Sequence, residues 1–167
     1  MAKVTLTGNT VSLVGDLPRV GLKAPEISLV KGNLEEVTFS AFAGKKIVLN
    51  IFPSLDTATC ATTVRKFNAI ASEMPNTTVL AISKDLPFAM ERFCTTEGLK
   101  NVVSLSAFRN ASFGRDYGVE ILDGPLRGLF SRALLVVDEN LQIIYSELVA
   151  EITEEPNYTE VLKILER

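Results

Sequence analysis

Two cysteines, Cys60 and Cys94, are the residues best suited to chemistry in this chain of 167 residues, which contains no histidine and no tryptophan. Cys60 follows an apolar run at 47–52, Pro53 and Thr57, so the sequence predicts a strand that turns into a helix just before the cysteine. A helix N-terminus offers unpaired N–H groups and a positive dipole end, which favour a thiolate over a thiol. Cys60 is therefore the candidate nucleophile.

The residue types that the chain lacks exclude several kinds of site. Without histidine there is no Cys–His or Ser–His–Asp machinery and no histidine metal ligand. Two cysteines are too few for a four-thiolate zinc site, and neither a GxxxxGK[ST] nor a GxGxxG loop is present. We expect a protein that needs no metal and no organic cofactor.

Charge and hydropathy restrict the partners. The net charge is −3 with no long basic run, which argues against nucleic acid and against an anionic membrane surface. The apolar runs at 47–52 and 133–137 are too short to span a bilayer, and the first residues lack the apolar core of a signal peptide. We expect a cytoplasmic protein, and in that reducing compartment a cysteine pair is more often catalytic than structural.

The apolar pattern predicts the elements that must position the cysteines. Strands alternate with helices and a hairpin comes first, with Gly8-Asn9 as its turn, so we expect an α/β sandwich with a mixed central sheet. Residues 1–167 are predicted to form a single domain, with residues 1–15 as a hairpin extension, and Asp85 is predicted to cap the helix that carries Cys94. The predicted strands are 4–6, 11–14, 47–52, 78–82, 102–105, 133–137 and 142–149, and the predicted helices are 58–74, 86–97 and 158–165.

Taken singly, each candidate residue also has an ordinary explanation. Either cysteine alone fits a small buried apolar side chain, and Thr57 fits a helix N-cap. Pro53 could simply end a strand, and Arg132 could be a surface arginine at the start of the next one. The combination Pro53-x-x-x-Thr57-x-x-Cys60 favours a site, because Thr57 would lie one helical turn from the sulfur.

This array resembles the peroxidatic motif of the peroxiredoxins, and further segments resemble their bacterial thiol peroxidase branch over nearly the whole chain. The matching segments are Val64-Arg65-Lys66-Phe67-Asn68, Asp85-Leu86-Pro87-Phe88-Ala89, Arg92-Phe93-Cys94, Phe108-Arg109-Asn110, Tyr117-Gly118-Val119, Asp123-Gly124-Pro125-Leu126 and Glu151-Ile152. The resemblance implies a thioredoxin-like fold and reduction of hydrogen peroxide and organic hydroperoxides.

The resemblance also implies roles for individual residues. Cys60 would be the peroxidatic cysteine that becomes a sulfenic acid, and Cys94 the resolving cysteine that forms a disulfide with it inside one subunit. Thr57, Pro53 and Arg132 would surround the sulfur. Thioredoxin would be the reductant, and the family implies a homodimer.

Two further expectations concern geometry. Disulfide Cα atoms lie within about 7 Å of each other, and both cysteines are predicted inside helices, so we expect local unwinding during turnover. Leu55, Leu129 and Phe130 are candidates for an apolar pocket that would favour alkyl or lipid hydroperoxides, although core packing is the favoured explanation for any one of them alone.

Two other functions stay open at this point. One is a redox-sensing module whose cysteine pair changes a surface that a partner binds, and the other is a structural thioredoxin-like domain with inert thiols. A thiol–disulfide oxidoreductase is disfavoured, because Cys60 and Cys94 do not form a Cys-x-x-Cys motif.

Overall fold

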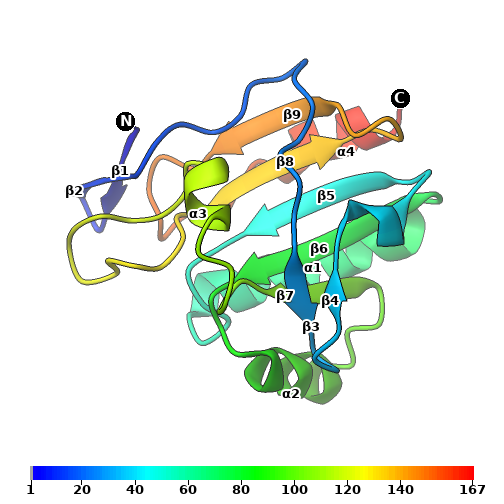
Figure 1. The fold of residues 1–167 in the computed structure, drawn as a ribbon, viewed down its shortest axis with the longest axis horizontal. Helices are drawn as coiled ribbons and strands as arrows, with labels where there is room; N and C mark the ends of the chain where they lie inside the picture. Colours follow the sequence, from blue (N-terminus) through cyan, green and yellow to red (C-terminus); the bar gives the residue numbers. More distant parts are fainter. Residues whose placement is uncertain (1) are drawn as a thin grey trace.

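The computed structural model describes residues 2–167, and its centre is a seven-stranded mixed sheet with the order β4-β3-β7-β6-β5-β8-β9 (Figure 1). Met1, part of the predicted hairpin extension 1–15, lies outside these residues. The elements are β1 (Lys3–Leu6), β2 (Asn9–Ser12), β3 (Leu29–Lys31), β4 (Glu36–Val37), the 3-10 helix η1 (Phe39–Phe42), β5 (Lys46–Ile51), α1 (Ala58–Glu73), β6 (Thr77–Ser83), α2 (Pro87–Glu97), β7 (Val102–Ser106), α3 (Phe113–Asp116), β8 (Ala133–Val137), β9 (Ile143–Leu148) and α4 (Tyr158–Leu165).

Strand β5 lies in the middle of the core, as its apolar run predicts. It pairs parallel with β6 and antiparallel with β8. Ile47, Leu49 and Ile51 belong to the apolar cluster on one face of the sheet, whereas Val48 and Phe52 belong to the cluster on the other face. Burial on both faces is why this strand reads as a continuous apolar run rather than an alternating one.

Helices cover both faces of the sheet (Figure 1). Val64 and Phe67 of α1, Met90 of α2 and Val161 of α4 pack in one cluster with Val48 of β5. Helix α3 lies against the opposite face, where its residues join the second large cluster. The expected α/β sandwich with a mixed sheet and an N-terminal hairpin is confirmed.

The N-terminal hairpin of β1 and β2 forms a separate sheet that packs on the side of the molecule. Val4 and Val11 share an apolar cluster with Ile152, whose backbone N–H donates to the carbonyl of Thr5 over 2.8 Å. The turn is one residue earlier than predicted, because Thr7 and Gly8 both take positive φ, 48° and 86°, as a tight hairpin turn requires.

The structure differs from the sequence analysis at two other places. Leu86, not Asp85, is the N-cap residue of α2, and the Asp85 carboxylate binds other groups. Strand β3 was not predicted, because its three residues are too few to show a periodic pattern. Among residues 2–167, no helix is both long and apolar enough to cross a membrane.

Candidate active site

Cys60 is the third residue of α1, which begins after the turn that follows β5. The first N–H groups of a helix have no partner within it, so the backbone around Cys60 presents free donors and the positive dipole end. The side chain packs against the apolar cluster of Phe52 and Val64 and has no exposed surface. Cys60 therefore lies in a dry site at the carboxyl end of the central strand.

Arg132 brings the guanidinium that contacts this sulfur. It precedes β8, whose first residue, Ala133, pairs with Ile51 at the end of β5, so the register places Arg132 beside the exit of β5. Its Nη2 donates to Cys60 Sγ over 3.2 Å, and its Nε donates to the Ile152 carbonyl over 2.9 Å. The predicted surface alternative is therefore wrong, because Arg132 is only 1% exposed.

The charge of Arg132 has no carboxylate partner within ion-pair distance in the described part of the chain. A buried charge is costly unless it is paired and hydrogen-bonded, and arginine does not lose its proton in proteins. Its Nη1 is buried and has no hydrogen-bond partner among residues 2–167. This arrangement offers a cationic donor aimed at sulfur and a second donor free for an oxygen atom.

Thr57 and Pro53 lie on the chain that connects β5 to α1. Thr57 is the N-cap residue of α1, and its hydroxyl donates to the carbonyl of Ser54 over 3.0 Å rather than to Cys60. The Thr57 hydroxyl proton is thus engaged by Ser54, while the hydroxyl oxygen keeps lone pairs that can accept a hydrogen bond. Pro53 is buried directly after the strand. The structure brings Cys60 and Arg132 into contact and places Thr57 in the exposed turn beside them.

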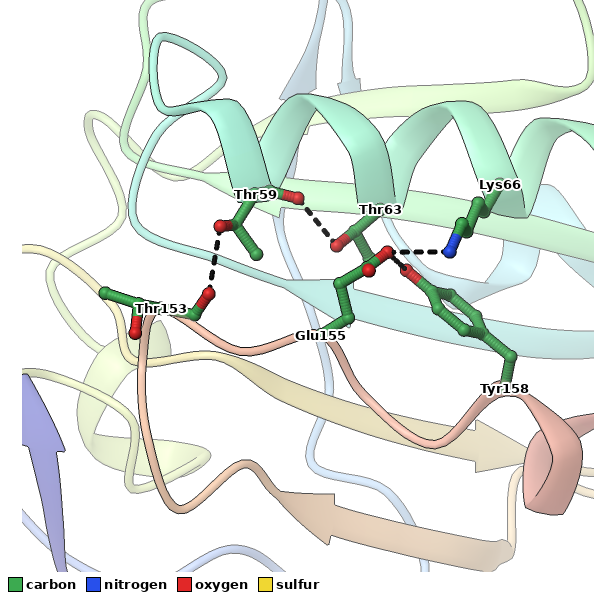
Figure 2. Close-up of polar contacts among 6 residues, drawn as sticks. All are labelled: Thr59, Thr63, Lys66, Thr153, Glu155 and Tyr158. Carbon is green, nitrogen blue, oxygen red and sulfur yellow. Dashed lines mark hydrogen bonds and ion pairs between the residues drawn. The ribbon is translucent and has the colours of Figure 1, made fainter. Parts of the chain in front are cut away.

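The segment after β9 is a part of the site that sequence reasoning did not identify, although Glu151-Ile152 belongs to the resemblance. Figure 2 shows it lying along α1, where Thr59 Oγ1 donates to the Thr153 carbonyl over 3.0 Å. Farther along, Glu155 lies 3.0 Å from Lys66 and accepts from Tyr158, and the Lys66 contact holds the pKa of Glu155 below its usual value. Because Ile152 holds Arg132, this segment links the arginine to the helix that carries Cys60.

Cys94 has a different environment in the last turn of α2. Its Sγ lies 3.0 Å from Ser104 Oγ, and burial raises the pKa of its thiol despite that hydrogen bond. A cavity of about 470 Å³ lies beside Cys94 rather than Cys60 and is also lined by Lys31, Glu91 and Ser104. Both cysteines are free thiols, so the structure does not join them in a disulfide.

Of the three residues predicted for a hydroperoxide pocket, Leu129 is partly exposed, and Leu55 and Phe130 pack in different apolar clusters. Leu55 packs in the cluster of Cys60, whereas Phe130 packs in the cluster on the opposite face with its ring 5.3 Å from that of Phe113. Both side chains are buried in the core. Across residues 2–167, no three acidic or cysteine side chains gather as they would around a metal ion.

Comparison with known proteins identifies what the chain is similar to. A family model described as Redoxin matches residues 19–162. The thiol peroxidase of Corynebacterium glutamicum is 52% identical over 165 residues, which cover 99% of each chain. The crystal structure of a peroxiredoxin-like protein from Aquifex aeolicus superposes with a TM-score of 0.93 at 40% identity, covering 99% of this chain and 96% of that one. Thiol peroxidase from Chromobacterium violaceum gives a TM-score of 0.91 at 25% identity, covering 98% and 95%. These similarities confirm the predicted thioredoxin-like fold and the resemblance stated from the motifs.

Proposed function

Because the chain belongs to the Redoxin family and to its bacterial thiol peroxidases, we propose that it reduces hydroperoxides through Cys60 and is regenerated through Cys94. Thiol-dependent peroxide reduction is the activity of this family, and the chain is a peroxiredoxin-type peroxidase. The observation that carries the choice of Cys60 is the 3.2 Å contact of its sulfur with the buried Arg132.

In the first step the Cys60 thiolate attacks one oxygen of the hydroperoxide. A sulfur–oxygen bond forms as the oxygen–oxygen bond breaks, and the other oxygen takes the proton of the attacked hydroxyl and leaves as water or an alcohol. Sulfur is thereby oxidised to a sulfenate, which takes one proton from solvent to become the sulfenic acid. Arg132 stabilises the thiolate, and its free Nη1 is available for the oxygen that gains charge. The Thr57 hydroxyl oxygen can accept a hydrogen bond from the O–H group of the hydroperoxide.

Magnitudes explain why a reactive thiolate alone is insufficient. A free cysteine is only a few per cent ionised at neutral pH, so complete ionisation raises the nucleophile population about 30-fold, or about 2 kcal/mol. Enzymes commonly supply at least about 8 kcal/mol. The remainder must come from positioning the peroxide and stabilising charge during bond cleavage, which is the role proposed for Arg132 and the start of α1.

In the second step the Cys94 thiol attacks the sulfenic acid, releases water and forms an intrasubunit disulfide. The free thiols lie in separate helices with separate partners, so we propose that α1, α2 or both unwind locally to form this bond. Closing a loop of about 35 residues restricts the unfolded chain by nearly 4 kcal/mol. Lost helical packing offsets part of that gain and leaves the disulfide reducible.

The remaining features of the proposal concern regeneration and context. A dithiol reductant, proposed to be thioredoxin, attacks the disulfide and returns both cysteines to thiols. We also propose a homodimer, a single domain over residues 1–167 and a cytoplasmic location, where a reducing environment keeps such a pair available. Substrates are proposed to include hydrogen peroxide and organic hydroperoxides.

The test is a single turnover followed by reductive cycling. Reduced protein mixed with one equivalent of hydrogen peroxide should yield a peptide pair linked through Cys60 and Cys94, at the mass of one chain under denaturing, non-reducing conditions. Thioredoxin, its reductase and NADPH should then support many turnovers. A disulfide between two chains, or oxidation without any disulfide, would contradict the proposed resolution step.

A further inference from the structure

The carboxylate of Asp85 binds the turn that leads into α1. Its Oδ1 accepts from Ser54 Oγ over 2.7 Å, and its Oδ2 accepts from the Leu55 N–H over 2.8 Å. Its Oδ2 also accepts from Ser83 Oγ over 2.6 Å. The contacts with Ser54 and Leu55 hold the turn, while the contact with Ser83 holds the carboxylate to the end of β6.

These contacts join the carboxyl ends of three parallel strands. Ser54 follows β5, Ser83 ends β6, and Ser106 ends β7 and donates its hydroxyl to the Asp85 carbonyl. Strands β5, β6 and β7 run parallel, so their carboxyl ends meet at one edge of the sheet, which is also the edge from which α1 begins. Asp85 therefore ties the turn after β5 to the ends of β6 and β7.

Hydrogen bonds of Ser54 connect the Asp85 contacts to the start of α1. Its carbonyl accepts from both the N–H and the hydroxyl of Thr57, over 3.2 and 3.0 Å, and its Oγ accepts from the Asp56 N–H over 3.1 Å. Thr57 is the N-cap residue, and Cys60 follows three residues later. The position of the helix start thus depends on Ser54, which Asp85 holds.

Few other contacts restrain the turn on this side. A cavity of about 190 Å³ separates it from α2 and is lined by Asp56, Asp85, Arg92 and Phe93 among others. Releasing the Asp85 contacts would therefore let the exposed residues Asp56 and Thr57 move, whereas the buried Leu55 side chain would have to leave its place in the cluster of Cys60.

We propose that Asp85 is a positioning residue that holds the turn 54–57, and with it Thr57 and Cys60, in the geometry that reacts with peroxide. Release of its contacts with Ser54 and Leu55 is the first part of the unwinding that leads to the disulfide. The effect of Asp85 on the rates of the peroxide step and of disulfide formation rests on the proposed function, whereas its restraint on the turn does not.

The test compares Asp85→Ala, Asp85→Asn and Ser54→Ala with wild type. In fully reduced protein without peroxide, amide exchange at residues 54–60 should accelerate at least about 10-fold in Asp85→Ala, which removes both contacts to the turn. The acceleration should be smaller in the other two variants, which remove or weaken only part of these contacts. In stopped-flow experiments the peroxide step should slow about 10-fold while disulfide formation becomes several-fold faster. A general loss of stability would not change the two rates in opposite directions.

Asp138→Ala is the matched control, because the Asp138 carboxylate holds another turn by accepting from the N–H groups of Asn140 and Gln142, at the opposite end of the sheet. It should change neither exchange at 54–60 nor either rate. Unchanged exchange in Asp85→Ala, or two rates that change in the same direction, would overturn the proposal. If wild type does not react with peroxide, the proposed function fails, while the exchange measurement still decides whether Asp85 holds the turn. If Asp85→Ala does not fold, Asp85→Asn and Ser54→Ala decide the same question.

Discussion

The two cysteines show how one fold gives the same functional group two different environments. Cys60 is completely buried at the beginning of a helix and contacts a buried cation, whereas Cys94 lies half-buried at the end of another helix beside a neutral hydroxyl and a cavity. A helix N-terminus and a guanidinium both favour a thiolate, while desolvation without a cation favours the thiol. We therefore expect the charge within contact distance, rather than burial alone, to determine which cysteine reacts.

The strongest test of this comparison exchanges each cysteine for serine. Cys60→Ser should abolish peroxide consumption in the coupled thioredoxin assay, because it removes the nucleophile. Cys94→Ser should lose thioredoxin-driven cycling but retain one stoichiometric oxidation of Cys60. Equal loss of that first oxidation in the two variants would show that the two sites do not differ as described.

A substitution of Arg132 tests the cation that distinguishes the sites. Arg132→Met should slow the peroxide step about 10²–10³-fold, the effect of removing one donor that stabilises developing charge. Arg132→Lys should recover only part of this loss, because an ammonium cannot contact sulfur and oxygen through a planar fork. The control is Arg65→Met, which removes an exposed arginine of α1 that forms an ion pair with Glu97. Circular dichroism should show that each variant is folded before rates are compared.

The pH dependence of Cys94 alkylation tests the environment described for the second cysteine. Burial raises the pKa of Cys94, so its thiolate fraction at neutral pH is below that of a free cysteine. In Cys60→Ser, the midpoint of iodoacetamide reactivity should lie above that of the same protein in urea. Ser104→Ala should move the midpoint higher still, since the Ser104 hydrogen bond lowers this pKa. A midpoint at or below the value in urea would contradict the described environment.

The smallest expected effect concerns Glu151, next to the residue that holds Arg132. Its carboxylate accepts from Thr5, Thr153 and the N–H groups of Thr7 and Gly8, and these bonds lower its pKa to about 2. Because the folded pKa lies below the unfolded one, the stabilisation is present above about pH 4 and is lost as the pH falls towards 2.

Amide exchange should therefore show the hairpin turn losing protection in acid before the central sheet does. Glu151→Gln should already show that loss at neutral pH and change the peroxide rate by less than about 2-fold. The neighbouring, exposed Glu154→Gln serves as the control. Equal protection of the turn in both variants would argue against a role for the Glu151 contacts.

The sequence predicted most of the sheet and the position of Cys60, because the run at 47–52 and the spacing of Pro53, Thr57 and Cys60 are local signals. The contact of Arg132 with Cys60 depends on the register of β8 against β5, which no local sequence pattern predicts. Asp85 was predicted as a helix cap because sequence shows only its neighbours, whereas its partners Ser54 and Leu55 come from another strand's end. The Asp85 contacts were therefore missed, and the Arg132 contact was expected only from the family resemblance.

The central claim is that peroxide reacts with the buried Cys60 and not with the more accessible Cys94. The most direct measurement treats reduced Cys94→Ser and Cys60→Ser with one equivalent of hydrogen peroxide, traps sulfenic acid with dimedone and maps the adduct by mass spectrometry. We predict near-complete labelling of Cys60 in Cys94→Ser within seconds and almost none of Cys94 in Cys60→Ser. Comparable labelling of the two cysteines, or labelling of Cys94 alone, would contradict the account.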